Sequence, residues 1–130
     1  MVNGYNQYRA YQTETATRED MVALLYDGAR RFVDQALVAH EAKDRAEVSR
    51  YIGKAQMIFT ELAAALDPAA GEITQNLAKL YDYWNWRLGQ GVINQDSEAF
   101  REVSATLVEM HAAWVEAAKQ VRAQRSVRVG

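Results

Sequence analysis

The chain of 130 residues contains no cysteine, only one proline and no long hydrophobic run. Without cysteine it has no disulfide framework, no thiol nucleophile and no thiolate ligand for a metal, which fits a reducing compartment. Its apolar runs, such as Leu62 to Leu66, are too short to span a membrane. Its first twenty residues are polar, unlike a secretory signal. We therefore expect a cytoplasmic protein without membrane insertion.

The chain also has no large excess of positive or negative charge. Lysine and arginine number 15 against 17 aspartates and glutamates, so the net charge is −2. This balance argues against nucleic acid as the main partner. The C-terminal run is the exception, and its cations are placed to complement the dipole of a final helix turn: Lys119, Arg122, Arg125 and Arg128.

The residue patterns of common enzymes and metal carriers are missing as well. No glycine-rich phosphate loop and no nucleophile elbow occur. A di-metal helix bundle needs Glu-x-x-His pairs, but Leu37 and Val108 stand three residues before His40 and His111. Two histidines and scattered carboxylates make a poor zinc site. We predict that the protein is not an enzyme and binds no metal or cofactor.

What the chain does have is apolar residues at a spacing of three or four throughout. Four amphipathic segments of roughly 20 to 25 residues must each bury one such stripe. Pro68 marks one sharp break, and the connections near 43–46, 67–71 and 93–97 are short, which favours antiparallel neighbours. The predicted fold class is all-α, an antiparallel up-down four-helix bundle over 17–124. A tyrosine-containing cap segment at 1–16 precedes it, and a basic tail at 125–130 follows.

Several polar residues and glycines refine this picture. Thr17, Asp44 and Asp96 are the predicted N-caps. Gly28 and Gly53 interrupt the first two helices, each at a cost of about 1 kcal/mol relative to alanine. Such glycines indicate the close approach of a neighbouring helix or of a ligand.

Two near-copies of one motif are the most informative feature: Leu25-Tyr26-Asp27-Gly28 and Leu80-Tyr81-Asp82-Tyr83. A tyrosine needs a dry place for its ring and a polar partner for its hydroxyl, so it suits grooves and interfaces. A second set of tyrosines lies in the cap segment: Tyr5, Tyr8 and Tyr11. These three side chains would share one face if the cap segment were helical. These patterns predict a binding surface rather than a reaction centre.

As a set, these motifs resemble the FliS family, the flagellar export chaperones that guard flagellin. The resemblance runs from about Asn6 to about Glu116. The pieces that carry it are Asn6-Gln7-Tyr8-Arg9-Ala10-Tyr11-Gln12, Thr15-Ala16-Thr17, Leu24-Leu25-Tyr26-Asp27-Gly28-Ala29, Ile52-Gly53-Lys54-Ala55-Gln56-Met57-Ile58, Gly71-Glu72-Ile73, Leu80-Tyr81-Asp82-Tyr83 and Ala113-Trp114. The chain departs from the family pattern at Arg18, where proline is usual, and at Trp84 and Trp86. Two tryptophans two positions apart on a helix point to different sides, so we expect one of them to be exposed.

The resemblance implies an antiparallel bundle that binds the disordered C-terminal segment of flagellin in the cytoplasm, prevents premature polymerisation and escorts it to the export apparatus. The export gate and other flagellar proteins are further implied partners. It also implies that Tyr8 and Tyr11 cover the groove when no client is bound. Two alternatives stay open: a helical adaptor of the same fold that binds a different flagellar or export protein, and a self-associating bundle.

We predict that the partner-binding residues are Tyr8, Tyr11, Leu24, Leu25, Tyr26, Ile52, Met57, Leu77, Tyr81, Tyr83 and Trp84. For Leu25, Ile52 and Leu77, a place inside the bundle fits the apolar stripe better than the groove does. Met57 and Tyr83 should face outward, because the core stripes pass through their neighbours in the sequence. A methionine on a binding surface adapts to varied side chains.

Overall fold

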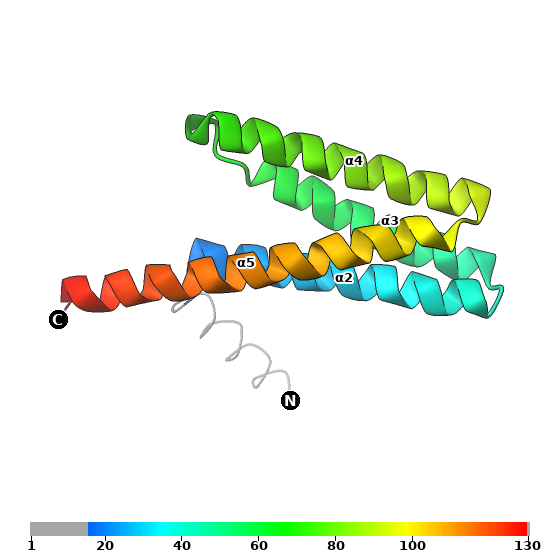
Figure 1. Ribbon diagram of the computed structural model, residues 1–130, viewed down its shortest axis with the longest axis horizontal. Helices are drawn as coiled ribbons and strands as arrows, with labels where there is room; N and C mark the ends of the chain where they lie inside the picture. Colours follow the sequence, from blue (N-terminus) through cyan, green and yellow to red (C-terminus); the bar gives the residue numbers. More distant parts are fainter. Residues whose placement is uncertain (1–15, 130) are drawn as a thin grey trace, which may run out of the picture.

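The computed structural model describes residues 16–129, and every regular element in this range is helical. The elements are α2 (Arg18–Glu41), α3 (Arg45–Ala64), the short 3-10 helix η1 (Pro68–Ala70), α4 (Glu72–Asn94) and α5 (Ser97–Val129). Successive α-helices run in opposite directions (Figure 1). The prediction of an all-α, antiparallel four-helix bundle is therefore confirmed.

The helices begin at capping residues that the sequence identifies. The Thr17 hydroxyl accepts the Asp20 amide at 2.9 Å, and the Asp20 carboxylate accepts the Thr17 amide at 2.9 Å, which closes a reciprocal capping box. Asp44 accepts the amide three residues later at 3.1 Å, and Asp96 accepts the amide two residues later at 3.0 Å. All three predicted N-caps are confirmed, because capping depends only on neighbours in the chain.

Around the bundle, α2 packs against α3 and α5, and α4 packs against the same two helices from the other side. Thus α2 and α4 occupy opposite corners. Near the loop that joins them, α4 and α5 lie close together, and they diverge toward the other end of the molecule (Figure 1). At Gly91 a Cβ atom would lie 2.7 Å from the Phe100 ring and 2.9 Å from the Ala99 Cβ. Glycine is therefore required for the close contact at this end.

The core follows the predicted apolar stripes. Its largest fully buried side chains are Trp84, Tyr26, Tyr81, Phe59, Phe100, Ile52, Leu62, Leu88 and Leu107. At Gly28 a Cβ atom would lie 3.3 Å from Cδ1 of Ile58, so α3 approaches closely there, as predicted. At Gly53 a Cβ atom would meet nothing within 4 Å among the described residues. Of the two causes expected for Gly53, the approach of a neighbouring helix is therefore not found among the described residues, and the approach of a ligand stays a prediction.

The last helix is the longest. With 33 residues, α5 is about 50 Å long, against about 36 Å for the 24 residues of α2. It therefore extends past the start of α2 (Figure 1). The helix passes without a break through the expected boundary at residue 124, because residues 97–129 contain no glycine or proline to end it. Arg122 forms an ion pair with Asp20 and so holds this helix to the start of α2.

Candidate functional site

A cleft opens where α4 and α5 diverge. It has a volume of about 200 Å³ and lies between the start of α2, the end of α3, η1, the first half of α4 and one residue of α5. We call it the end cleft. Its lining residues are Arg18, Glu19, Val22, Leu62, Ala65, Leu66, Asp67, Ala70, Ile73, Thr74, Leu77, Tyr81 and Trp114. Most of these side chains are apolar, so the cleft suits the apolar side chains of a partner.

Two buried tyrosines meet beneath the end cleft. The hydroxyl oxygens of Tyr26 and Tyr81 lie 2.8 Å apart, and the two side chains are 0% and 2% exposed. Because α2 and α4 stand at opposite corners, this hydrogen bond crosses the centre of the bundle. Burial raises the pKa of both hydroxyls above the ordinary value for tyrosine. Both therefore stay protonated at physiological pH and act as neutral hydrogen-bonding groups.

Aromatic rings surround this pair. Trp114 stacks on Tyr26 at a centroid distance of 6.3 Å and an interplanar angle of 22°, and Trp84 meets Tyr26 edge-on at 6.0 Å. Phe59 lies 5.3 Å from Trp84. Stacked and edge-on aromatic pairs contribute about 0.5–1.5 kcal/mol each beyond the burial of their area. The floor of the cleft is therefore a packed aromatic cluster.

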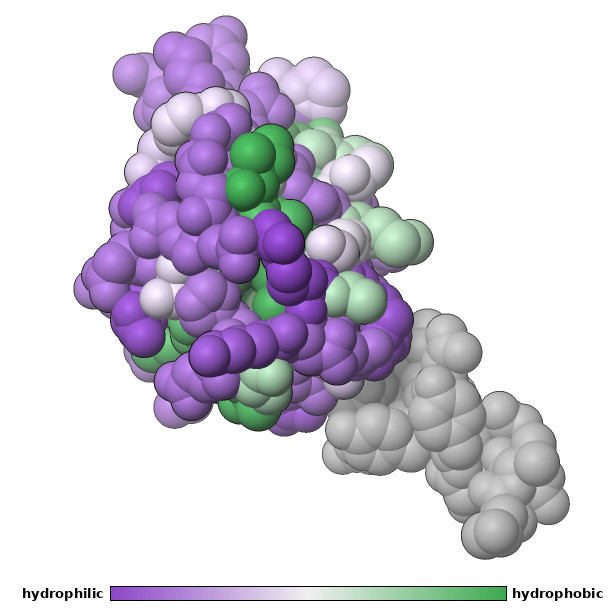
Figure 2. Space-filling view, turned by 90° about the vertical axis from the view of Figure 1, so that its right-hand side faces the viewer, coloured by the Kyte–Doolittle hydropathy of each residue, from purple (hydrophilic) through white to green (hydrophobic). Residues whose placement is uncertain are grey.

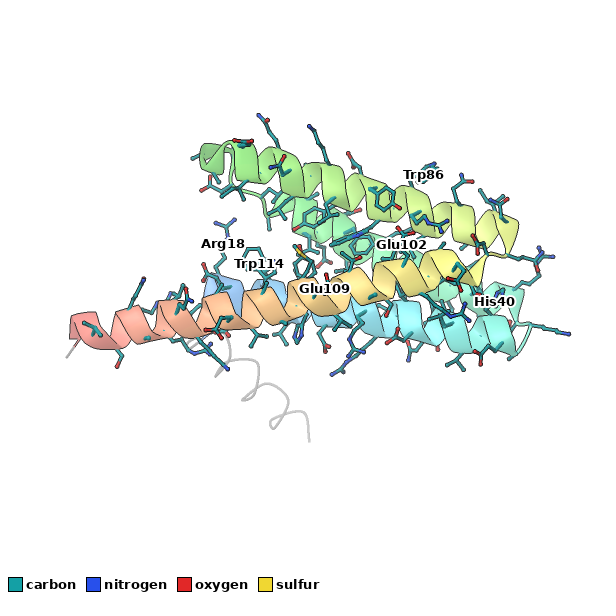
Figure 3. All side chains as sticks on the ribbon, in the orientation of Figure 1. Arg18, His40, Trp86, Glu102, Glu109 and Trp114 are labelled. Carbon is teal, nitrogen blue, oxygen red and sulfur yellow. The ribbon has the colours of Figure 1, made fainter. Side chains whose placement is uncertain are left out.

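Three of the residues that line the cleft are charged: Arg18, Glu19 and Asp67. The Arg18 guanidinium donates to the backbone carbonyl of Ala65 and so bridges α2 to the end of α3. In Figure 3, Arg18 and Trp114 are labelled at the same end of the molecule. The hydrogen bond from Arg122, and then the one from the Thr17 amide, lower the pKa of Asp20. The Arg18–Ala65 and Arg122–Asp20 contacts thus join α2 to the end of α3 and to α5 next to the cleft.

The predicted site residues do not form one groove. Leu77 and Tyr81 line the end cleft, and Tyr26 lies directly beneath it. Leu25 is half-buried against the core. Ile52 and Trp84 are interior, at 2% and 1% exposed. The placing of Tyr26 and Trp84 in an open groove is thus corrected, because the stripes they share with the core turn them inward. Ile52 lies inside the bundle, as its apolar stripe favours. Tyr8 and Tyr11 lie outside the described residues.

Three predicted residues face outward on separate helices. Leu24 on α2, Met57 on α3 and Tyr83 on α4 are 47%, 67% and 42% exposed. The prediction that Met57 and Tyr83 face outward is confirmed. Trp86 is 58% exposed while Trp84 is buried, so the prediction for the two tryptophans is confirmed too. Contact between any of these residues and a partner stays a prediction.

Tyr83 belongs to a polar contact between α4 and α5. Its hydroxyl donates to the Glu102 carboxylate, which also accepts from Nε of Arg87 at 3.0 Å. These two donors lower the pKa of Glu102, the Tyr83 hydroxyl first. The Trp86 ring lies 6.0 Å from the Tyr83 ring and carries the aromatic surface outward.

Some cleft residues were not among the predicted site residues. Leu66 and Trp114 follow the same spacing as the core stripes, and Ile73, at 66% exposed, also belongs to such a stripe. Nothing in their local pattern separates them from interior residues. They line a cleft only because α4 and α5 diverge at this end.

A larger cavity of about 600 Å³ lies at the opposite end of the bundle. It is lined by His40, Glu41, Lys43, Asp44, Arg45, Val48, Ser49, Gly91, Val92 and Gln95. Figure 2 shows this end as mostly hydrophilic, with hydrophobic residues visible in its centre and in smaller patches toward the edges. Its rim carries charges of both signs, and it contains none of the predicted site residues. The end cleft is therefore the better candidate for the functional site.

The described part of the chain lacks two further kinds of feature, a metal-binding cluster and a membrane-spanning helix. Residues 16–129 hold no group of three or more histidine, aspartate or glutamate side chains that could bind a metal ion. Among these same residues, every helix is too short or too polar to cross a lipid bilayer.

Known proteins resemble this chain over nearly its whole length. The profile of the family described as Flagellar protein FliS matches residues 1–121. The flagellar secretion chaperone FliS of Bacillus subtilis is 30% identical over 123 residues, which cover 95% of this chain and 92% of that protein. The FliS of Salmonella typhimurium is 32% identical, with 86% and 84% covered, and the FliSB of Pseudomonas aeruginosa is 35% identical, with 79% and 82% covered.

Proposed function

This chain belongs to the FliS family of flagellar secretion chaperones, and we propose that its client is the C-terminal segment of flagellin. In this proposal the protein works in the cytoplasm, keeps the segment from polymerising early and delivers it to the export apparatus. No catalytic step is needed for this task, because masking an apolar stripe is a matter of binding alone.

The end cleft is the observation that carries the proposal. A disordered segment that later forms helices in a filament carries an apolar stripe. While this stripe is exposed, it associates with any other apolar surface. Leu66, Leu77 and Trp114 offer such a surface in the cleft. This is recognition of an amphipathic helix in a groove, where apolar anchors at helical spacing fill the receiving surface.

A flagellin segment is longer than the cleft, and we propose that it continues along the outward-facing residues. Leu24, Met57 and Tyr83 lie on three different helices, so a client that contacts all of them must wrap around the bundle. Segments that fold on binding can wrap in this way, and the ordering cost keeps their affinity moderate. Moderate affinity suits a client that has to be released for export.

The second part of the proposal concerns the cap segment at 1–16. Arg18 and Glu19, at the start of α2, line the end cleft, so the segment that precedes them is tethered at its edge. A short tether gives an effective concentration on the order of millimolar. We propose that Tyr8 and Tyr11 cover the cleft when it is empty and give way to the client. Deleting residues 1–12 should then raise client affinity and lower the solubility of the free protein. If both stayed unchanged, this part of the proposal would be wrong.

Calorimetric titration with the last 50 or so residues of flagellin from the same organism, a length set by helices of about 30–50 Å, tests the main proposal. One-to-one binding with a large negative heat-capacity change would indicate buried apolar surface and coupled folding. No heat and no shift in melting temperature would reject flagellin as the client. Titration with other flagellar or export proteins would then test the alternative of an adaptor with the same fold.

A further inference from the structure

The hydroxyl pair beneath the end cleft has one hydrogen more than it uses. Each phenol carries one hydrogen, and the 2.8 Å contact between Tyr26 and Tyr81 needs only one of them. The other hydrogen must find a second acceptor. Among residues 16–129, the only hydrogen-bond acceptor within reach of either hydroxyl is the other member of the pair.

The surroundings of Tyr26 decide which hydrogen is left over. Tyr26 is 0% exposed, so its own hydrogen has Tyr81 as its only acceptor in the described part of the chain. The hydrogen of Tyr26 is therefore donated to the Tyr81 hydroxyl. The remaining hydrogen belongs to Tyr81.

Tyr81 is the member of the pair that lines the end cleft. Water can accept its hydrogen while the cleft is open. A client that fills the cleft displaces this water, and the affinity falls unless the client supplies an acceptor in its place.

We propose that the Tyr81 hydroxyl donates a hydrogen bond to the client and selects a segment with an uncharged polar residue among its apolar anchors. This inference rests on the proposed function. Within a regular helix the backbone carbonyls are already paired, so the acceptor is a side-chain amide or hydroxyl on the apolar face of the client. A carboxylate fits less well, because most of the lining is apolar and its charged residues, Arg18, Glu19 and Asp67, carry a net charge of −1.

The test compares Tyr81→Phe with Tyr26→Phe by calorimetric titration of the full chain with the flagellin segment. Both variants lose one buried hydroxyl and keep the ring. Tyr81→Phe should weaken binding by about 5- to 10-fold, the effect of one net hydrogen bond. Tyr26→Phe should change the affinity by less than about twofold, since the Tyr81 hydrogen is still present for the client.

A client-side series completes the experiment. Each Asn, Gln, Ser or Thr of the segment is replaced in turn by an apolar residue of similar size. One replacement should weaken binding to the natural chain but leave binding to Tyr81→Phe unchanged, which is the coupling expected of two groups in contact. Unchanged affinity of Tyr81→Phe, or equal losses in both tyrosine variants, would overturn the inference while the proposed function stands. Failure of the natural chain to bind would overturn both.

Discussion

The phenolic oxygens of Tyr26 on α2 and Tyr81 on α4 lie 2.8 Å apart, although 55 residues separate them in the sequence. Each is the tyrosine of one copy of the Leu-Tyr-Asp motif. The two helices occupy opposite corners of the bundle, so this contact is made by side chains across its centre. Trp114 from α5 stacks on Tyr26 and joins the third helix to the pair. The repeated motif thus builds one shared structural unit beneath the end cleft.

This hydrogen bond should appear as coupling in stability. Tyr26→Phe and Tyr81→Phe should each lower the free energy of unfolding by about 1–3 kcal/mol, because each leaves a buried polar group without its partner. The double variant should lose less than the sum of the two, since neither partner is then left unpaired. Urea denaturation of the four proteins measures this, and strictly additive losses would show that the hydroxyls do not interact.

Replacing Gly91 or Gly53 with alanine should change the free energy of unfolding in opposite directions. Gly91→Ala forces a Cβ against Phe100 and Ala99 and should destabilise the protein by about 1–3 kcal/mol. Gly53→Ala adds a methyl group in open space and should stabilise the helix by up to about 1 kcal/mol. Chemical denaturation of both variants provides the measurement. A neutral Gly91→Ala would mean that α4 and α5 shift apart without cost.

A substitution at Met57 should change client affinity without changing the stability of the fold. Met57→Glu places a charge on a side chain that is 67% exposed, so the melting temperature should barely change. If the flagellin segment contacts this position, its affinity should fall by about fivefold or more, which corresponds to roughly 1 kcal/mol. Val38→Glu is the matched control, because Val38 on α2 is 69% exposed and is not a predicted contact. Equal affinities for the two variants would remove Met57 from the binding surface.

The Asp20 carboxylate should make part of the stability depend on pH. Its pKa is lowered by the hydrogen bonds from Arg122 and the Thr17 amide, so its ionised form favours the folded state. This contribution is complete above the unfolded-state pKa of about 3.9 and disappears as the pH falls through the lower folded-state value.

Asp20→Asn should therefore be less stable than the natural chain at neutral pH, and the difference should shrink as the pH falls below about 4. Thermal unfolding of both proteins across this range provides the check. A stability difference that does not vary with pH would indicate that the charge of Asp20 has no role.

The local periodicity of the sequence was sufficient to predict much of this structure. The four helices, the cap at Thr17, the outward direction of Met57 and the exposure of one of Trp84 and Trp86 all depend on neighbours within one or two helix turns. Such features are set by helix geometry and capping, which the chain carries in its own order of residues. The sequence by itself therefore determined the fold class and the outward face of each helix.

The tertiary structure alone decided how the helices meet. Gly28 and Gly53 look alike in the sequence, yet Ile58 packs against the first and nothing described packs against the second. Gly91 holds α4 close to α5 at one end, and the divergence of these helices at the other end exposes Trp114 to a cleft. Contacts between distant segments depend on the crossing of whole helices, and a local apolar pattern does not specify that crossing.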